Sequence, residues 1–143
     1  MPVPTIKKVL MADDDADIRK ICNLSLSAVG KWQVVLAATG AEAVAKAKEE
    51  IPGLILLDVM MPGVDGVTAY HQIKEVPALK DVPVILITAK VQPEELEKYM
   101  GLGVAGVIMK PFDPMRLPGE IMRLLTQHYD STSVQADAGA PKK

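Results

Sequence analysis

Residues 54–57 read LILL, and an aspartate, Asp58, follows this aliphatic run. A continuous apolar run of this length is typical of a strand buried on both faces, as in a parallel sheet with helices above and below it. Four other short apolar runs indicate strands of the same kind: IKKVLMA (6–12), QVVLA (33–37), VILI (84–87) and AGVIM (105–109). The chain is therefore expected to contain five buried strands.

The segments between these runs have helical character. The first carries apolar residues at helical spacing, and AEAVAKAKEE (41–50) is rich in alanine and stops at Pro52-Gly53. Further helices are expected from about Asp65, from Pro93, and over about 118–128. Five βα units with right-handed crossovers predict an α/β fold, a doubly wound three-layer sandwich with a five-stranded parallel sheet.

Length and composition fit one globular domain. The chain has 143 residues, 49% of them hydrophobic and 24% charged, which excludes a disordered chain. A net charge of −2 disfavours direct binding to nucleic acid. One cysteine and no long apolar run lead us to expect a cytoplasmic protein with no membrane insertion. We expect the domain to cover residues 1–129 and residues 130–143 to form a disordered tail or linker stub.

Polar groups follow four of the predicted strands. Asp13 and Asp14 follow the first strand, Asp58 the third, Thr88 the fourth and Lys110 the fifth, whereas the second strand ends in AAT. Because sites in open α/β sheets form at the carboxyl ends of the strands, these groups are expected to meet at one edge. The second strand then belongs at the side of the sheet, which matches the 2-1-3-4-5 order of flavodoxin-like folds.

The expected cluster is acidic. Three carboxylates against one lysine leave a surplus of negative charge, and like charges about 4 Å apart repel by ~4 kcal/mol at an effective dielectric of 20. Hard oxygen ligands with few carboxylates favour Mg²⁺, which commonly bridges a carboxylate and a phosphate. Asp58 is the predicted nucleophile toward a phosphoryl group, with Thr88 and Lys110 neutralising the phosphoryl oxygens.

Each of these residues also has a purely structural interpretation. Asp15 or Asp17 could cap the first helix, Thr88 could be an ordinary strand residue, and Lys110 a solvated strand end. Their joint placement at one edge favours the functional interpretation.

Four segments resemble the receiver domains of bacterial two-component response regulators, and the layout is similar to that of the single-domain chemotaxis regulators. The segments are VLMADDDADIR, LILLDVMMPGVDG, VPVILITAK and GVAGVIMKPF, within about residues 5–128. The resemblance implies that Asp58 is the phosphoacceptor and that Asp13 and Asp14 hold Mg²⁺ with the main-chain carbonyl of Met60. It also implies that Thr88 and Lys110 contact the phosphoryl group.

The resemblance further implies a cis peptide between Lys110 and Pro111, and a switch rather than an enzyme with turnover. A sensor histidine kinase or a phosphotransfer protein would donate the phosphoryl group, and the chain would catalyse its own phosphotransfer and dephosphorylation at most. The face made by the fourth helix, fifth strand and fifth helix would then control an unidentified protein target. Met60 and Lys90 occupy positions that tune the phosphoryl lifetime in the family.

One position departs from the family's pattern. Val107 stands where many members carry tyrosine or phenylalanine, and Tyr99 is a possible substitute. Two alternatives remain. One is an aspartate-nucleophile phosphatase of the haloacid dehalogenase type, whose order of aspartate, threonine and lysine is superficially similar. The other is a pseudo-receiver that binds partners without being phosphorylated, which Val107 keeps open. In the phosphatase family an acidic pair follows the lysine, whereas here only Asp113 and Glu120 do so before the predicted tail.

Overall fold

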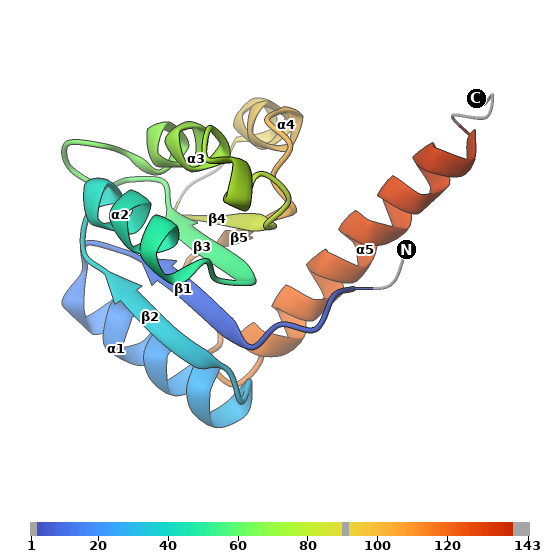
Figure 1. Cartoon of the computed structure of the whole chain (residues 1–143). Coiled ribbons are helices and arrows are strands. Elements are labelled where there is room, and N and C mark those ends of the chain that lie inside the picture. Colours follow the sequence, from blue (N-terminus) through green and yellow to red (C-terminus); the bar gives the residue numbers. More distant parts are fainter. Residues whose placement is uncertain (1–2, 90–91, 139–143) are drawn as a thin grey trace.

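A parallel sheet of five strands forms the centre of the computed structural model (Figure 1). The structure describes residues 3–89 and 92–138, and for residues 131–138 it gives only the course of a helix. The strand order is β2-β1-β3-β4-β5 and every neighbouring pair is parallel, as predicted. The strands are β1 (Lys8–Ala12), β2 (Gln33–Ala37), β3 (Leu54–Asp58), β4 (Val84–Thr88) and β5 (Gly106–Met109).

A helix follows each strand. The helices are α1 (Ala16–Leu24), α2 (Gly40–Glu50), α3 (Gly66–Lys74), α4 (Pro93–Gly101) and α5 (Leu117–Ala138). Asp65 caps α3 by accepting a hydrogen bond from Thr68 N at 2.8 Å. Pro93 opens α4, where the missing N–H of proline costs nothing. A 3-10 turn, η2 (Pro77–Leu79), precedes β4.

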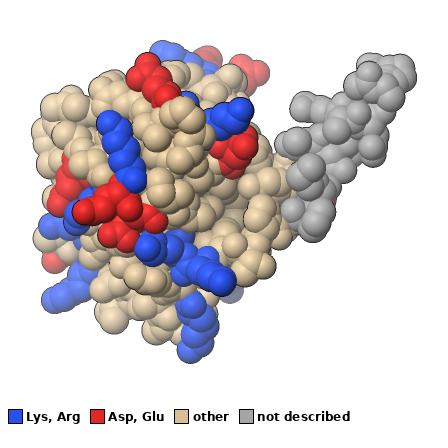
Figure 2. All heavy atoms as spheres, viewed as in Figure 1, with Lys and Arg blue, Asp and Glu red and all other residues tan. Residues whose placement is uncertain are grey.

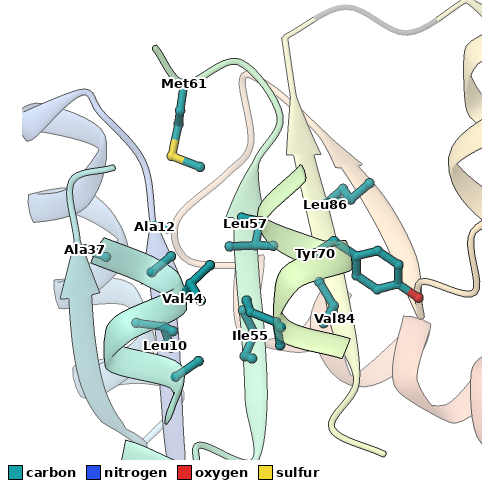
Figure 3. Close-up of a cluster of buried hydrophobic side chains, with 14 of the residues drawn as sticks. Leu10, Ala12, Ala37, Val44, Ile55, Leu57, Met61, Tyr70, Val84 and Leu86 are labelled. Atoms are coloured by element: carbon teal, nitrogen blue, oxygen red, sulfur yellow. The ribbon is translucent and has the colours of Figure 1, made fainter. Parts of the chain in front are cut away.

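The helices cover both faces of the sheet and create two hydrophobic cores. On one face, strand residues pack against α2 and α3; Figure 3 shows Leu10, Ile55 and Leu57 beside Val44 of α2 and Tyr70 of α3. On the other face, strand residues pack against α1 and α5. Strands β3 and β4 are buried along their whole length, which explains their continuous apolar sequences. The structure thus confirms the predicted doubly wound sandwich.

The structure differs from the sequence-based expectation at two helix ends. Helix α1 is followed directly by a π-helical turn, η1 (Ser25–Val29), which periodicity does not reveal. Helix α5 continues to Ala138, although the sequence predicts a helix only to about residue 128 and a tail without regular structure from 130. No glycine or proline lies between 120 and 138, and lengthening an existing helix costs little. Residues 139–143 of the predicted tail lie outside the described residues, and the domain boundary at 129 remains a prediction.

Charged side chains of both signs are intermixed on the face shown in Figure 2, as the small net charge leads one to expect. Within residues 3–89 and 92–138, no helix combines the length and the apolar character that crossing a membrane requires.

Candidate functional site

The register of the sheet aligns the carboxyl ends of four strands. Ala12, which precedes Asp13, lies opposite Leu57, which precedes Asp58. Asp58 in turn lies opposite Ile87, the residue before Thr88. Thr88 lies opposite Met109, the residue before Lys110. The polar residues singled out from the sequence therefore lie at the same edge of the sheet.

Three carboxylates converge at this edge. One carboxylate oxygen from each of Asp13, Asp14 and Asp58 lies within 4.8 Å of the others. Asp13 and Asp58 are buried, with 0% and 2% of their surface exposed, whereas Asp14 is exposed. Thr88 is 2% exposed. The site is therefore an acidic cluster that opens to solvent at Asp14.

Lys110 reaches back into this cluster. Its Nζ lies 2.8 Å from Asp13 Oδ2 and 3.2 Å from Asp58 Oδ1. Burial and the neighbouring charge of Asp13 raise the pKa of Asp58, and the Lys110 ammonium only partly opposes them. Burial alone would lower the pKa of Lys110, but its contacts with Asp13 and Asp58 outweigh burial and raise that pKa. Lys110 therefore remains an ammonium at neutral pH.

The turn between β1 and α1 holds the acidic pair in place. Asp13 Oδ1 accepts a hydrogen bond from Asp15 N at 2.9 Å. Asp15 Oδ1 accepts from Asp17 N at 2.8 Å and from Ile18 N at 3.3 Å, so Asp15 is the N-cap of α1. Helix capping thus accounts for Asp15, but not for Asp13 or Asp14.

Arg19 also contacts this turn, and sequence reasoning missed it. Its Nη1 donates a hydrogen bond to the main-chain carbonyl of Asp13 at 2.8 Å. In the sequence Arg19 is one of several charged residues in the first helical segment, and its spacing does not distinguish it from Asp17 or Lys20. Its position in the sequence, about one turn into the helix that follows the acidic end of the first strand, is the signal by which this contact could be predicted.

The loop after β3 brings α3 very close to Asp58. A Cβ atom at Gly66 would lie 2.3 Å from the Asp58 main-chain oxygen, so only glycine fits there. Gly66 N donates to Val59 O at 3.0 Å, which fixes the end of the loop. Met60 lies in this loop with 72% of its surface exposed. Its predicted role as a main-chain metal ligand remains a prediction.

The chemistry of the donors fits Mg²⁺. Three carboxylates face one ammonium, so the cluster carries an excess negative charge that a dication would offset. Asp13 Oδ2 is fully buried and accepts no hydrogen bond from the described residues, although the Lys110 ammonium lies 2.8 Å away. A buried carboxylate oxygen of this kind favours a cation close by.

Three further expectations concern the Lys110–Pro111 peptide, Val107 and Lys90. The Lys110–Pro111 peptide is cis, as the resemblance implied. Val107 is partly buried and packs against the same core cluster as Tyr99 and Leu102. Lys90 lies outside the described residues.

The chain is similar to full-length regulators. Probable transcriptional regulator ycf27 of Cyanophora paradoxa is 37% identical over 126 residues, which are 88% of this chain and 51% of that protein. The alkaline phosphatase synthesis transcriptional regulatory protein PhoP of Bacillus subtilis (strain 168) is 35% identical over 121 residues, or 83% of this chain and 48% of that protein. The chain thus spans about half the length of these curated relatives.

The chain matches several solved structures over nearly the whole length of those structures. Chemotaxis protein CheY4 of Vibrio cholerae has a TM-score of 0.77 and 31% identity, covering 84% of this chain and 99% of that chain. A BeF3-activated DrrB receiver domain has a TM-score of 0.72 and 29% identity, covering 85% and 99%. Residues 9–122 match the family described as "Response regulator receiver domain". The chain therefore belongs to the response regulator receiver domains of two-component systems.

Proposed function

We propose that the chain is a Mg²⁺-dependent phosphoryl acceptor in which Asp58 receives the phosphoryl group from a phosphohistidine. The donor is a sensor histidine kinase or a phosphotransfer protein. The observation that carries this proposal is the position of Asp58. It is a buried carboxylate at the end of β3, within 4.8 Å of two other carboxylates and 3.2 Å from the Lys110 ammonium.

The proposed transfer is a displacement at phosphorus. A carboxylate oxygen of Asp58 forms a bond to phosphorus while the bond from phosphorus to the donor imidazole nitrogen breaks, and its electron pair returns to that nitrogen. Asp13, Asp14, Asp58 and the main-chain carbonyl of Met60 would hold Mg²⁺, which supplies positive charge against the phosphoryl oxygens. Lys110 and Thr88 supply further positive charge and a hydroxyl donor from the neighbouring strands.

Phosphorylation would place a charge of about −2 where a partly compensated carboxylate stood. Lys110 then has a new anion to contact, and Thr88 lies at the end of the adjacent strand β4. Helix α4 has no buried residue among those described, so little hydrophobic burial opposes a shift of this helix within the face made by α4, β5 and α5. We propose that this face changes its affinity for a protein target.

A population shift of this kind has a definite energetic requirement. Moving an equilibrium from 1:99 to 99:1 takes ~5.5 kcal/mol of differential interaction, which several charge-assisted hydrogen bonds can supply but one cannot. Val107 has no ring to rotate, so in this chain the shift would pass through Thr88 and the packing of Tyr99 and Leu102. The proposed role is that of a switch, with no turnover beyond its own phosphotransfer and dephosphorylation.

Intact-mass spectrometry after incubation with acetyl phosphate tests the proposal. We expect one added phosphoryl group with Mg²⁺, none with EDTA, and none in Asp58→Asn with Mg²⁺. Asp17→Asn is the matched control, because Asp17 is exposed on α1, and it should be phosphorylated like the unsubstituted chain. No adduct in the presence of bound Mg²⁺ would favour the pseudo-receiver. Continuous release of phosphate with turnover would favour a phosphatase.

A further inference from the structure

Arg19 makes a contact that the phosphotransfer chemistry does not use. Its guanidinium Nη1 donates a 2.8 Å hydrogen bond to the main-chain oxygen of Asp13, six residues earlier. Arg19 is partly buried, whereas its neighbour Lys20 is exposed and has no hydrogen bond or ion pair among the described residues. Of the two adjacent cations of α1, only Arg19 therefore contacts the acidic turn.

The contact closes a ring of hydrogen bonds around the turn. Asp15 N donates to Asp13 Oδ1 at 2.9 Å, and Arg19 N donates to Asp15 O at 3.0 Å. The Arg19 side chain then returns to Asp13 O. On the other side, Asp13 N donates to Ala37 O of β2 at 3.1 Å. Asp13 is thus fixed through its amide, its carboxylate and its carbonyl.

The carbonyl of Asp13 belongs to the peptide unit that leads to Asp14. The orientation of this peptide decides where the Asp14 carboxylate lies relative to that of Asp13. Asp14 is exposed, and no hydrogen bond of its side chain to another described residue holds it in place. The Arg19 contact therefore restrains the peptide unit that links the two residues of the acidic pair.

We propose that Arg19 is a positioning residue for the metal site, which fixes the peptide between Asp13 and Asp14 so that both carboxylates can bind one Mg²⁺. This inference rests on the proposed function, because it concerns the same site. Arg19 itself contacts neither the metal nor the phosphoryl group.

The direction in which Mg²⁺ affinity changes when Arg19 is replaced distinguishes positioning from simple electrostatics. Arg19 carries a positive charge near a cation site, so its charge alone opposes Mg²⁺ binding. If electrostatics were its only influence, Arg19→Met would bind Mg²⁺ more tightly. If Arg19 positions the acidic pair, the same substitution weakens binding despite the removal of a like charge.

The experiment is isothermal titration of the whole chain with MgCl₂ after removal of metals, together with urea unfolding of each variant. Arg19→Met keeps an apolar stem of similar length and removes both the donor and the charge. We expect its dissociation constant to rise about three- to tenfold, which is the scale of losing one ordinary hydrogen bond. Arg19→Lys keeps the charge and one donor and should lie between Arg19→Met and the unsubstituted chain.

Lys20→Met is the matched control, since it removes one positive charge from the same helix without touching the turn. Its affinity for Mg²⁺ should equal that of the unsubstituted chain or be slightly tighter. Unchanged or tighter binding by Arg19→Met would overturn the inference while leaving the proposed function intact. Absence of Mg²⁺ binding by the unsubstituted chain would instead overturn the metal site, and this inference with it. If Arg19→Met does not fold, Arg19→Ala, which also removes both the donor and the charge, provides the same test of sign.

Discussion

Replacing Gly66 by alanine should damage the fold at the position where α3 approaches the phosphoacceptor. A Cβ at this residue would lie 2.3 Å from Asp58 O and 2.8 Å from Val59 Cα, both main-chain atoms that cannot rotate away. The backbone angle of Gly66 is not in the left-handed region, so alanine itself is compatible with the local conformation. The cost of the substitution is therefore steric.

The magnitude follows from the overlap. Ordinary contacts begin at 3.4 Å, so α3 and β3 would have to separate by roughly 1 Å in a close-packed core. Overpacking of this kind costs about 2–3 kcal/mol, set against a gain of up to ~1 kcal/mol from the better helix propensity of alanine. We expect a net destabilisation of about 1–2 kcal/mol, and a slower phosphorylation by acetyl phosphate because the displaced backbone is that of Asp58.

Urea unfolding measures the effect, and the chain offers a control for the same chemical change. Gly119 in α5 has no atom within 4 Å of an added Cβ, so Gly119→Ala should raise the stability by about 0.5–1 kcal/mol. The two substitutions should therefore shift the unfolding midpoint in opposite directions. A Gly66→Ala variant as stable as the unsubstituted chain would refute the close approach of α3 to Asp58.

Three other predictions concern single side chains. The Tyr70 hydroxyl donates to Leu102 O at 2.8 Å, so Tyr70→Phe should lower the free energy of unfolding by about 1 kcal/mol with little loss of packing; an unchanged urea midpoint would contradict this. Burial, followed by the charge of Asp13, raises the pKa of Cys22 to about 12, so the thiol should resist alkylation at pH 8 in the folded chain and react fully in urea. The pKa of the Cys22 thiol is therefore higher in the folded chain than in the unfolded chain, so its contribution to stability is present below pH 9 and is lost as the pH rises to about 12. The free energy of unfolding of Cys22→Ala should lack this part of the pH dependence. Burial and the charge of Asp13 raise the pKa of Asp58, which means that its ionised form destabilises the folded chain at pH 7. In EDTA at pH 7, Asp58→Asn should therefore unfold at a higher temperature than the unsubstituted chain, and a lower unfolding temperature would contradict this prediction.

Sequence reasoning located the strands well because burial on both faces leaves a strong pattern. LILL and VILI are continuous apolar runs, and the structure places them in β3 and β4. The strand order followed from the lack of chemistry at the end of β2, and the structure confirms it. The juxtaposition of Asp13 with Asp58 followed in turn from the order and the common direction of the strands.

Contacts made by individual side chains could not be predicted in this way. The hydrogen bond from Arg19 to Asp13 O depends on how far α1 turns back toward the strand end, which periodicity does not specify. The bond from the Tyr70 hydroxyl to Leu102 O joins α3 to the residue that follows α4, and β4 lies between these two points in the sequence. The extension of α5 to Ala138 was missed because polar residues without periodicity read as a tail, although nothing in 120–138 stops a helix.

Chemical trapping identifies the residue that carries the phosphoryl group, which we expect to be Asp58. After incubation with acetyl phosphate and Mg²⁺, borohydride reduces an aspartyl phosphate to homoserine, and tandem mass spectrometry of the peptides locates the change. We expect homoserine at position 58 alone, and unmodified aspartate at positions 13 and 14. Homoserine at position 13 or 14, or none at position 58 in a chain whose mass shows the adduct, would contradict it.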